Sequence, residues 1–338
     1  MASSLGTSRQ IVIALSSVAL GLWAFKTVNE ISGPAFEPIL TVCSDSSIPI
    51  DEFAEKTGYH TWEPRVGLGA FNVLVCLITQ FLLELRNTYP AGFLTWFGVM
   101  VVAFPFGVAS TVEAGRQGAK GLIRYPLILG LTYQLFGISV MVPLLWVPAY
   151  IYGRGKGGVS VTRALASIPM NIPGLVLSCI CFTVDTDSYL WTVSAGILGG
   201  PLVIFICVFM WADSPPKIEA EAANDLGRQS VALAYRISLV VATILWFVWV
   251  YVAYSTYGTD VSSLWRAVWS EANASVAFMT IDTLVLFAGM LLYLSFRSAS
   301  AALKTLVLTP LLGPGGACSY TMAELEEAMR LPSAKKDE

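Results

Sequence analysis

Two carboxylates in this sequence lie within long apolar stretches, where a charge is expensive. Asp282 is the sole charged residue in ASVAFMTIDTLVLFAGMLLYLSF, and Glu113 lies near the end of VVAFPFGVASTVEAG. An ionisable side chain at mid-membrane costs at least about 2.5–3.5 kcal/mol, so each residue is a functional candidate by default. Burial should raise the pKa of both carboxyls. A protonated carboxylic acid in an apolar pocket can donate to a substrate that water does not reach.

A purely structural role is the alternative for Glu113. Arg116 follows three residues later, a spacing that lets the two side chains pair on a helix. We predict that Asp282 is the principal acid, because its surroundings are the more apolar. Glu113 would then orient Asp282, share its proton or take the proton back.

Aromatic residues form a second pattern, in ILWFVWVYVAYSTYG. Trp246 and Trp249 are three residues apart and share a helical face, where their π systems could stabilise a cation in a dry site. Contact with lipid or with a neighbouring helix is the other interpretation of these two residues. Tyr254 and Tyr257 fit an interfacial aromatic belt.

The elements that must position these side chains are membrane-spanning helices. The chain has 338 residues, of which 55% are hydrophobic and 13% charged, with a net charge of −3. A soluble domain is about 25% charged, so this composition excludes a soluble enzyme, a disordered protein and a nucleic-acid-binding protein. We predict an all-α, polytopic transmembrane helix bundle with about eight spans, at 10–28, 66–84, 91–112, 125–151, 164–184, 189–211, 234–255 and 273–296.

The bundle is expected to occupy residues 1–300, with an outer loop over 29–65 and core spans over 66–296. A cleaved signal peptide is the alternative for the first span. Residues 301–338 are predicted as a cytosolic tail, in which 303–313 lies on the membrane surface. Within the tail, Thr321 to Arg330 reads as a capped helix in solvent.

The distribution of Lys and Arg predicts the orientation of the bundle. With a cytosolic N-terminus, the cytosolic segments hold 13 of these residues and the opposite side holds 7. Cytosolic loops carry the excess of positive charge, so both termini are expected in the cytosol. The endoplasmic reticulum membrane is the default location for a eukaryotic multi-pass protein of this kind.

Metal and disulfide chemistry find little support in the sequence. His60 is the single histidine, and Asp185 and Asp187 form no metal-binding acidic motif, so we predict no metal and no cofactor. Cys76 lies within an apolar block, and Cys43 and Cys318 fall on opposite sides of the predicted membrane. No disulfide framework is therefore predicted.

The sequence resembles the fungal integral-membrane terpene cyclases of meroterpenoid pathways, the pyripyropene- and ascofuranone-type enzymes. The segment Phe278-Met279-Thr280-Ile281-Asp282 is similar to that family's F-[LM]-T-[VI]-D segment, and 236–249 resembles its aromatic helix before the last. Glu113 takes the place of the family's glutamate, within STVEAG instead of the usual N-x-x-W-E context. The longer N-terminus looks closer to the ascofuranone-type branch.

The resemblance implies a cyclase that uses neither metal nor cofactor. A lipophilic farnesyl-aromatic substrate with a terminal epoxide would come from the bilayer lipid, and Asp282 or Glu113 would protonate the epoxide oxygen. An alkene or hydroxyl of the substrate would then attack the opening carbon. Phe278, Met279, Trp246 and Trp249 are the predicted substrate contacts, and no nucleic acid is expected as a partner.

Other functional classes stay open at this stage. A proton-coupled transporter also needs membrane carboxylates, although the sequence has no internal repeat and no matched pair of broken helices. A seven-helix receptor and a non-catalytic scaffold are further alternatives. A cyclase predicts that Glu113 and Asp282 face one closed cavity, whereas a transporter predicts a polar path that reaches both sides.

Overall fold

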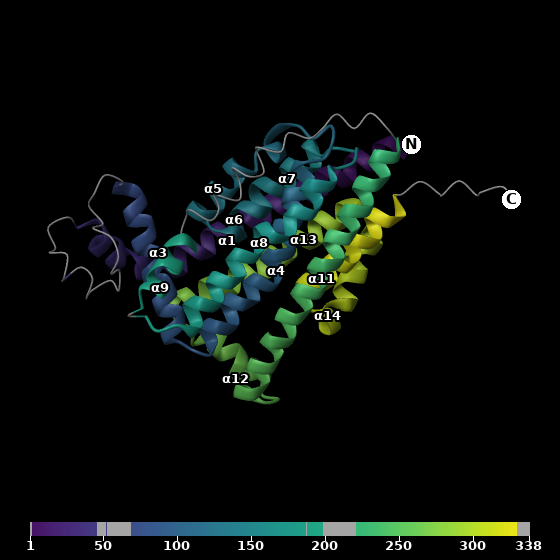
Figure 1. The fold of residues 1–338 in the computed structure, drawn as a ribbon. Helices are drawn as coiled ribbons and strands as arrows, with labels where there is room; N and C mark the ends of the chain where they lie inside the picture. Colours follow the sequence, from purple (N-terminus) through teal and green to yellow (C-terminus); the bar gives the residue numbers. More distant parts are fainter. Residues whose placement is uncertain (1, 46–51, 53–68, 187, 199–220, 330–338) are drawn as a thin grey trace.

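The computed structural model describes residues 2–45, 52, 69–186, 188–198 and 221–329, which form helices and no strand (Figure 1). The all-α bundle is therefore confirmed. Its elements are α1 (Ala2–Ser44), α3 (Gly69–Asn87), α4 (Ala91–Ala114), η1 (Gly121–Arg124), α5 (Pro126–Phe136), α6 (Ile138–Met141), η2 (Val142–Trp146), α7 (Val147–Gly153), α8 (Val161–Thr183), α9 (Tyr189–Leu198), α11 (Glu221–Tyr257), α12 (Val261–Trp265), η3 (Arg266–Ser270), α13 (Ala274–Arg297) and α14 (Ala299–Ala328).

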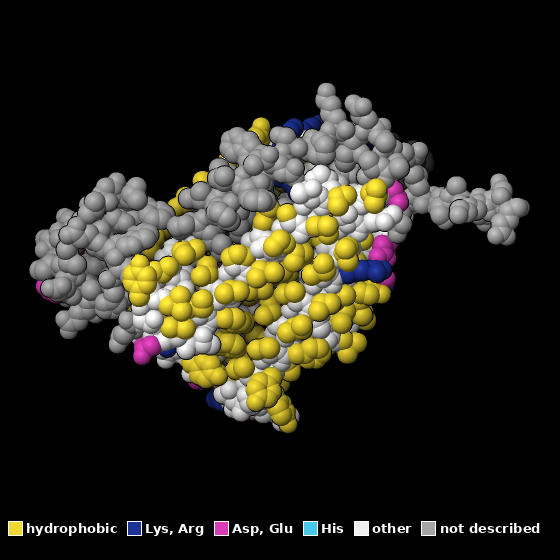
Figure 2. Space-filling model, viewed as in Figure 1, with side chains coloured by type: hydrophobic (Ala, Val, Ile, Leu, Met, Phe, Trp, Pro, Cys, Tyr) yellow, Lys and Arg dark blue, Asp and Glu magenta, His cyan; other side chains and the backbone are white. Residues whose placement is uncertain are grey.

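Within these residues, five helical segments are long and apolar enough to cross a membrane. They are Thr7–Pro34 of α1, α4, α8, Asp225–Tyr257 of α11, and α13. Apolar side chains also cover much of the visible face of the bundle (Figure 2). Since water would not solvate such a face, the protein is embedded in a membrane.

Helices α4 and α13 run in the same direction at the centre of the bundle. The Thr283 side chain packs against Gly98, and the Tyr293 hydroxyl bonds to Glu113 nearer the ends of both helices. The predicted spans placed these two helices in opposite directions, and that prediction was wrong. We call the end where α4 and α13 finish the upper end, and the end where they begin the lower end.

Helices α4 and α13 run in the same direction because one segment between them does not cross the bundle. Residues 125–151, predicted as one span, instead form a re-entrant hairpin with α5 as one arm and α6, η2 and α7 as the other. The arms meet at Gly137, whose φ of 85° favours glycine. At the upper end the arms lie together, because the Lys120 amide donates to the Gly153 carbonyl at 2.8 Å.

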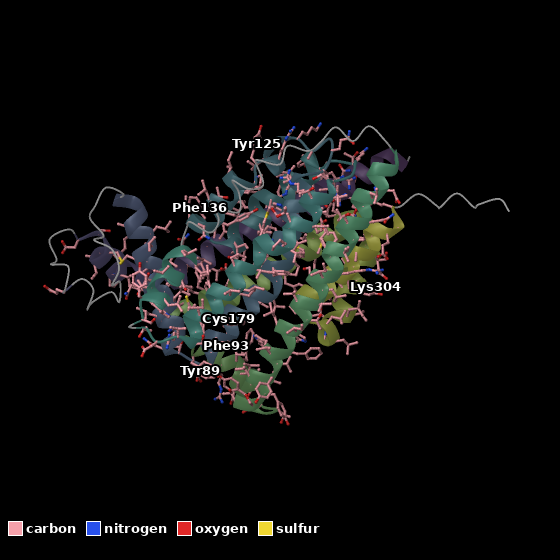
Figure 3. All side chains as sticks on the ribbon, viewed as in Figure 1. Tyr89, Phe93, Tyr125, Phe136, Cys179 and Lys304 are labelled. Atoms are coloured by element: carbon pink, nitrogen blue, oxygen red, sulfur yellow. A yellow bond between two sulfur atoms is a disulfide. The ribbon has the colours of Figure 1, made fainter. Side chains whose placement is uncertain are left out.

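Helix α14 is a second hairpin. It reverses at Gly313, where φ is 73°, so that the Thr305 hydroxyl reaches the Thr321 hydroxyl at 2.9 Å. Lys304 pairs with Glu324 on the outer side of this hairpin (Lys304 is labelled in Figure 3). The predicted solvent helix with a cap at Thr321 was wrong, because Thr321 is 2% exposed and packs inside the bundle.

The N-terminal helix is longer than the predicted first span. Helix α1 continues to Ser44 and so includes the first part of the segment expected as an outer loop; 46–51 and 53–68 lie outside the described residues. In the lower part of the bundle, α1 packs on α3 through the rings of Phe36 and Phe81. A disulfide joins Cys43 to Cys76, whereas the sequence predicted no disulfide framework.

This disulfide can be tested by counting thiols. Maleimide labelling of the denatured protein should add two more adducts after reduction than before it, as measured by mass spectrometry. Cys318→Ser, which removes a buried free thiol, should keep this difference of two. A Cys76→Ser variant that still gained two adducts on reduction would contradict the pairing.

Candidate functional site

The first candidate carboxylate, Glu113, lies in a buried network of charges at the upper end. Its Oε2 accepts from Arg116 Nε at 2.7 Å, and its Oε1 accepts from the Tyr293 hydroxyl at 3.1 Å. Arg116 also pairs with Glu326, and Arg297 donates to Glu326 at 2.8 Å. We call Glu113, Arg116, Arg297 and Glu326 the charge network.

The charge network is electrically balanced and almost dry. Glu113 is 1% exposed, Glu326 is 0% exposed and Arg116 is 6% exposed. Burial alone would raise the pKa of Glu326, but the guanidinium groups of Arg116 and Arg297 lower it below its usual value. Both carboxylates are therefore matched by cations, which is the structural role considered for Glu113 from its sequence spacing.

Asp282 lies in a different environment, at the tip of the α5–α7 hairpin. Its side chain is 4% exposed, and its Oδ1 accepts a hydrogen bond from the Ser139 backbone amide at 3.2 Å. Ser139 is in the first turn of the arm that begins with α6, so the positive end of that arm faces the carboxyl group. In the described part of the chain, no Lys or Arg forms an ion pair with Asp282.

Aromatic rings lie beside Asp282. A side chain at Gly137 would meet the Phe278 ring at 3.4 Å and Asp282 Oδ1 at 3.8 Å, which places these two groups at the same tip. Phe278 also contacts Phe81 edge to face, with ring centroids 5.5 Å apart. The structure thus brings Asp282 and Phe278 together at the tip of the hairpin.

The two carboxylates are not brought together. Glu113 bonds to Tyr293, which is eleven residues beyond Asp282 on α13, a separation of about 16 Å along a helix axis. One common cavity lined by Glu113 and Asp282 was expected; instead the two side chains lie at different levels of α13, and neither lines the cavities found beside Trp246, Tyr152 and Tyr257. Of the two carboxyl groups, only that of Asp282 has no ion-pair partner in the described structure.

The predicted tryptophans line a separate cavity of about 250 Å³. Trp246 and Trp249 stack with their ring centroids 5.0 Å apart. Thr280 and Leu284 of α13 also line this cavity, and each lies about 160° around the helix from Asp282. Trp246 and Trp249 are therefore on the far side of α13 from the carboxyl group.

The Met279 side chain lies near neither Asp282 nor the two tryptophans. It is 4% exposed and packs in an apolar cluster with Leu85, Val99 and Val276 at the lower end. The sequence-predicted contacts thus separate into three places: Phe278 at Asp282, Trp246 and Trp249 across α13, and Met279 in the core.

Sequence reasoning missed Ser139, Arg297 and Glu326. Ser139 follows Gly137 in an apolar block, and the Gly-Ile-Ser step was the one signal of a break there. Glu326 belongs to a charged segment that looks like an ordinary solvent-exposed helix. The described residues contain no group of three His, Cys, Asp or Glu side chains that could hold a metal ion.

No family model, no curated protein and no solved structure matches this chain.

The charge network predicts a large stability difference between two neighbouring glutamates. Glu326→Gln should lower the free energy of unfolding by about 3–5 kcal/mol, because it leaves buried guanidinium charge unmatched. Glu324→Gln on the same helix breaks only the exposed pair with Lys304, so it should change stability by less than about 1 kcal/mol. Denaturation of the purified protein in detergent measures both variants, and equal losses would contradict the assignment.

Proposed function

We propose that the protein is a membrane-embedded terpene cyclase in which Asp282 is the proton donor. The substrate class is a farnesyl-aromatic meroterpenoid with a terminal epoxide, or with an alkene in its place. The observation that carries this proposal is the environment of Asp282: a buried carboxyl group in an apolar span, with no ion-pair partner among the described residues and with aromatic rings beside it. Such a group is the acid that metal-free cyclisation requires.

The chemistry follows from this environment. The Asp282 carboxyl gives its proton to the epoxide oxygen while the epoxide C–O bond breaks. The electron pair of a substrate alkene or hydroxyl attacks the opening carbon, and the proton that the product then loses returns to the Asp282 carboxylate, which completes an isomerisation with no net change in atoms. The carboxylate left on Asp282 accepts the Ser139 N–H bond and faces the positive end of the arm from Ile138 to Gly153, both of which stabilise the charge that develops.

Because Glu113 and Asp282 do not lie together, Asp282 acts as a single acid in this proposal, in place of the pair expected from the sequence, and Glu113 has a structural task. Since its carboxylate is already bonded to Arg116 and Tyr293, it holds the upper ends of α4 and α13 together. Phe278 is the ring placed to contact the reacting end of the substrate. The dry surroundings prevent water from capturing the cation.

A transporter is the second candidate, and one observation favours it. The two hairpins, with tips at Gly137 and Gly313, both enter the bundle from the upper end. Helices that break inside the membrane are a feature of many secondary transporters. Proton-driven uptake by proteoliposomes that depends on Asp282, without any cyclised product, would support this candidate.

We infer that the upper end faces the cytosol, in the endoplasmic reticulum membrane. Most described cations lie at this end: Arg9, Arg116, Lys120, Arg124, Arg154, Lys156, Arg163, Arg228, Arg236 and Arg297. Arg86 and Arg266 lie at the lower end. The Cys43–Cys76 disulfide is near the lower end, and disulfides persist in oxidising compartments such as the lumen.

The cyclase proposal predicts a difference between the two membrane carboxylates. In microsomes with EDTA, the wild type should convert a farnesyl-aromatic epoxide to a cyclised isomer of unchanged mass, as detected by chromatography and mass spectrometry. Asp282→Asn should abolish the product, because the amide cannot donate the proton. Glu113→Gln should lower the amount of folded protein while the turnover per folded molecule persists.

Asp225→Asn is the matched control, since Asp225 bonds to Gln229 near the start of α11. It should keep full turnover. Full turnover in Asp282→Asn, or its complete loss per folded molecule in Glu113→Gln alone, would contradict the roles assigned here.

A further inference from the structure

The cavity beside Trp246 and Trp249 is lined almost entirely by apolar atoms. The Trp249 indole N–H donates to the Leu94 carbonyl at 2.7 Å, and the Thr283 hydroxyl donates to the Met279 carbonyl at 3.0 Å. The Thr280 hydroxyl likewise donates to backbone carbonyls. The donors of these groups are therefore already used within the protein, and the mostly apolar lining suits a hydrocarbon.

The floor of the cavity is rigid. Pro314 lines it, at the tip of the α14 hairpin. A Cβ at Gly313 would lie 2.5 Å from Trp246, and one at Gly315 would lie 1.8 Å from the Val101 carbonyl oxygen. The tip is thus packed against α11 and α4 with no spare room, which closes the cavity toward the upper end.

The short helix α12 covers the cavity at the lower end. Its residues Val261, Leu264 and Trp265 line the cavity, whereas its start is polar. The Asp260 carboxylate caps the helix by accepting from Ser262 and Ser263, and these hydrogen bonds, above all those of Ser263, lower its pKa to about 2.

Helix α12 and the residues after it combine apolar and charged side chains. Arg266 follows Trp265 directly and is about half exposed; it donates to the Ser263 hydroxyl at 3.0 Å and pairs with Glu271 at 3.9 Å. The exposed side chains of Val261, Trp265 and Tyr254 surround the same region. The apolar cavity therefore ends at Trp265, and the next residue carries a cation, a combination that suits an acyl chain joined to a phosphate group.

We propose that the cavity binds one acyl chain of a bilayer phospholipid, with the phosphate near Arg266. The chain lies against Trp246, Trp249 and Trp265, and it fills the space between α11 and α13. This site is across α13 from Asp282, so the bound lipid takes no part in proton transfer. Phospholipid binding here supports the packing of α11 on the bundle.

Native mass spectrometry in mild detergent tests this proposal, with phosphatidylcholine supplied during purification. The wild type should retain one phospholipid per chain. Thr283→Phe and Leu284→Phe, which fill the cavity from α13, should each lose it. Ile244→Phe is the matched control on the lipid-facing side of α11, where Ile244 is 58% exposed, and it should retain the lipid.

A second measurement guards against misfolded variants. Phosphatidylcholine with brominated acyl chains should quench the tryptophan emission of the wild type and of Ile244→Phe more strongly than that of Thr283→Phe. Equal lipid retention and equal quenching in all folded variants would overturn the site. Displacement of the lipid by the farnesyl-aromatic epoxide, together with lost turnover in Thr283→Phe, would instead make the cavity a substrate site.

Discussion

Four buried charges at the upper end constrain the rest of this fold. Glu113, Arg116, Arg297 and Glu326 come from α4, the turn after it, α13 and α14, and each is neutralised by a partner within the group. A buried charge that lost its partner would be strongly destabilising. The network therefore fixes which helix ends meet. It requires α4 and α13 to finish together and draws the last turns of α14 onto the bundle, where a free tail was expected.

The Asp282 carboxyl group differs from those of the charge network in its hydrogen-bonding partner. Its carboxyl group is as buried as that of Glu113, yet the described structure supplies it with a backbone amide instead of a cation. An ion pair favours the charged form of a carboxyl group, whereas desolvation favours the neutral acid. One membrane carboxyl is thus suited to hold helices together, and the other is suited to donate a proton.

The sequence predicted individual helices well where apolar length alone decides. The predicted spans at 91–112, 164–184 and 273–296 correspond to α4, α8 and α13. The sequence could not show the hairpin at Gly137. The apolar run over 125–151 is long enough for one crossing and equally compatible with two shorter arms. The decision depends on one positive φ value and on the Lys120–Gly153 contact, which exist only in the folded chain.

The candidate site was predictable in part for the same reason. The spacing between Glu113 and Arg116 is local, so their pairing could be foreseen. Glu326 follows Arg116 by 210 residues, and the pairing of Cys43 with Cys76 also depends on how distant helices pack. Once α5–α7 turned back, α4 and α13 became parallel, and the expected meeting of Glu113 with Asp282 was lost. Sequence alone could not reveal this consequence.

Infrared difference spectroscopy of the protein in lipid at neutral pH tests the central claim most directly. The account predicts a carbonyl band from a neutral carboxylic acid that shifts in deuterated buffer. This band should be absent in Asp282→Asn and present in Glu113→Gln. A wild-type spectrum without the band, or a band that disappears in Glu113→Gln and survives in Asp282→Asn, would contradict Asp282 as the buried acid.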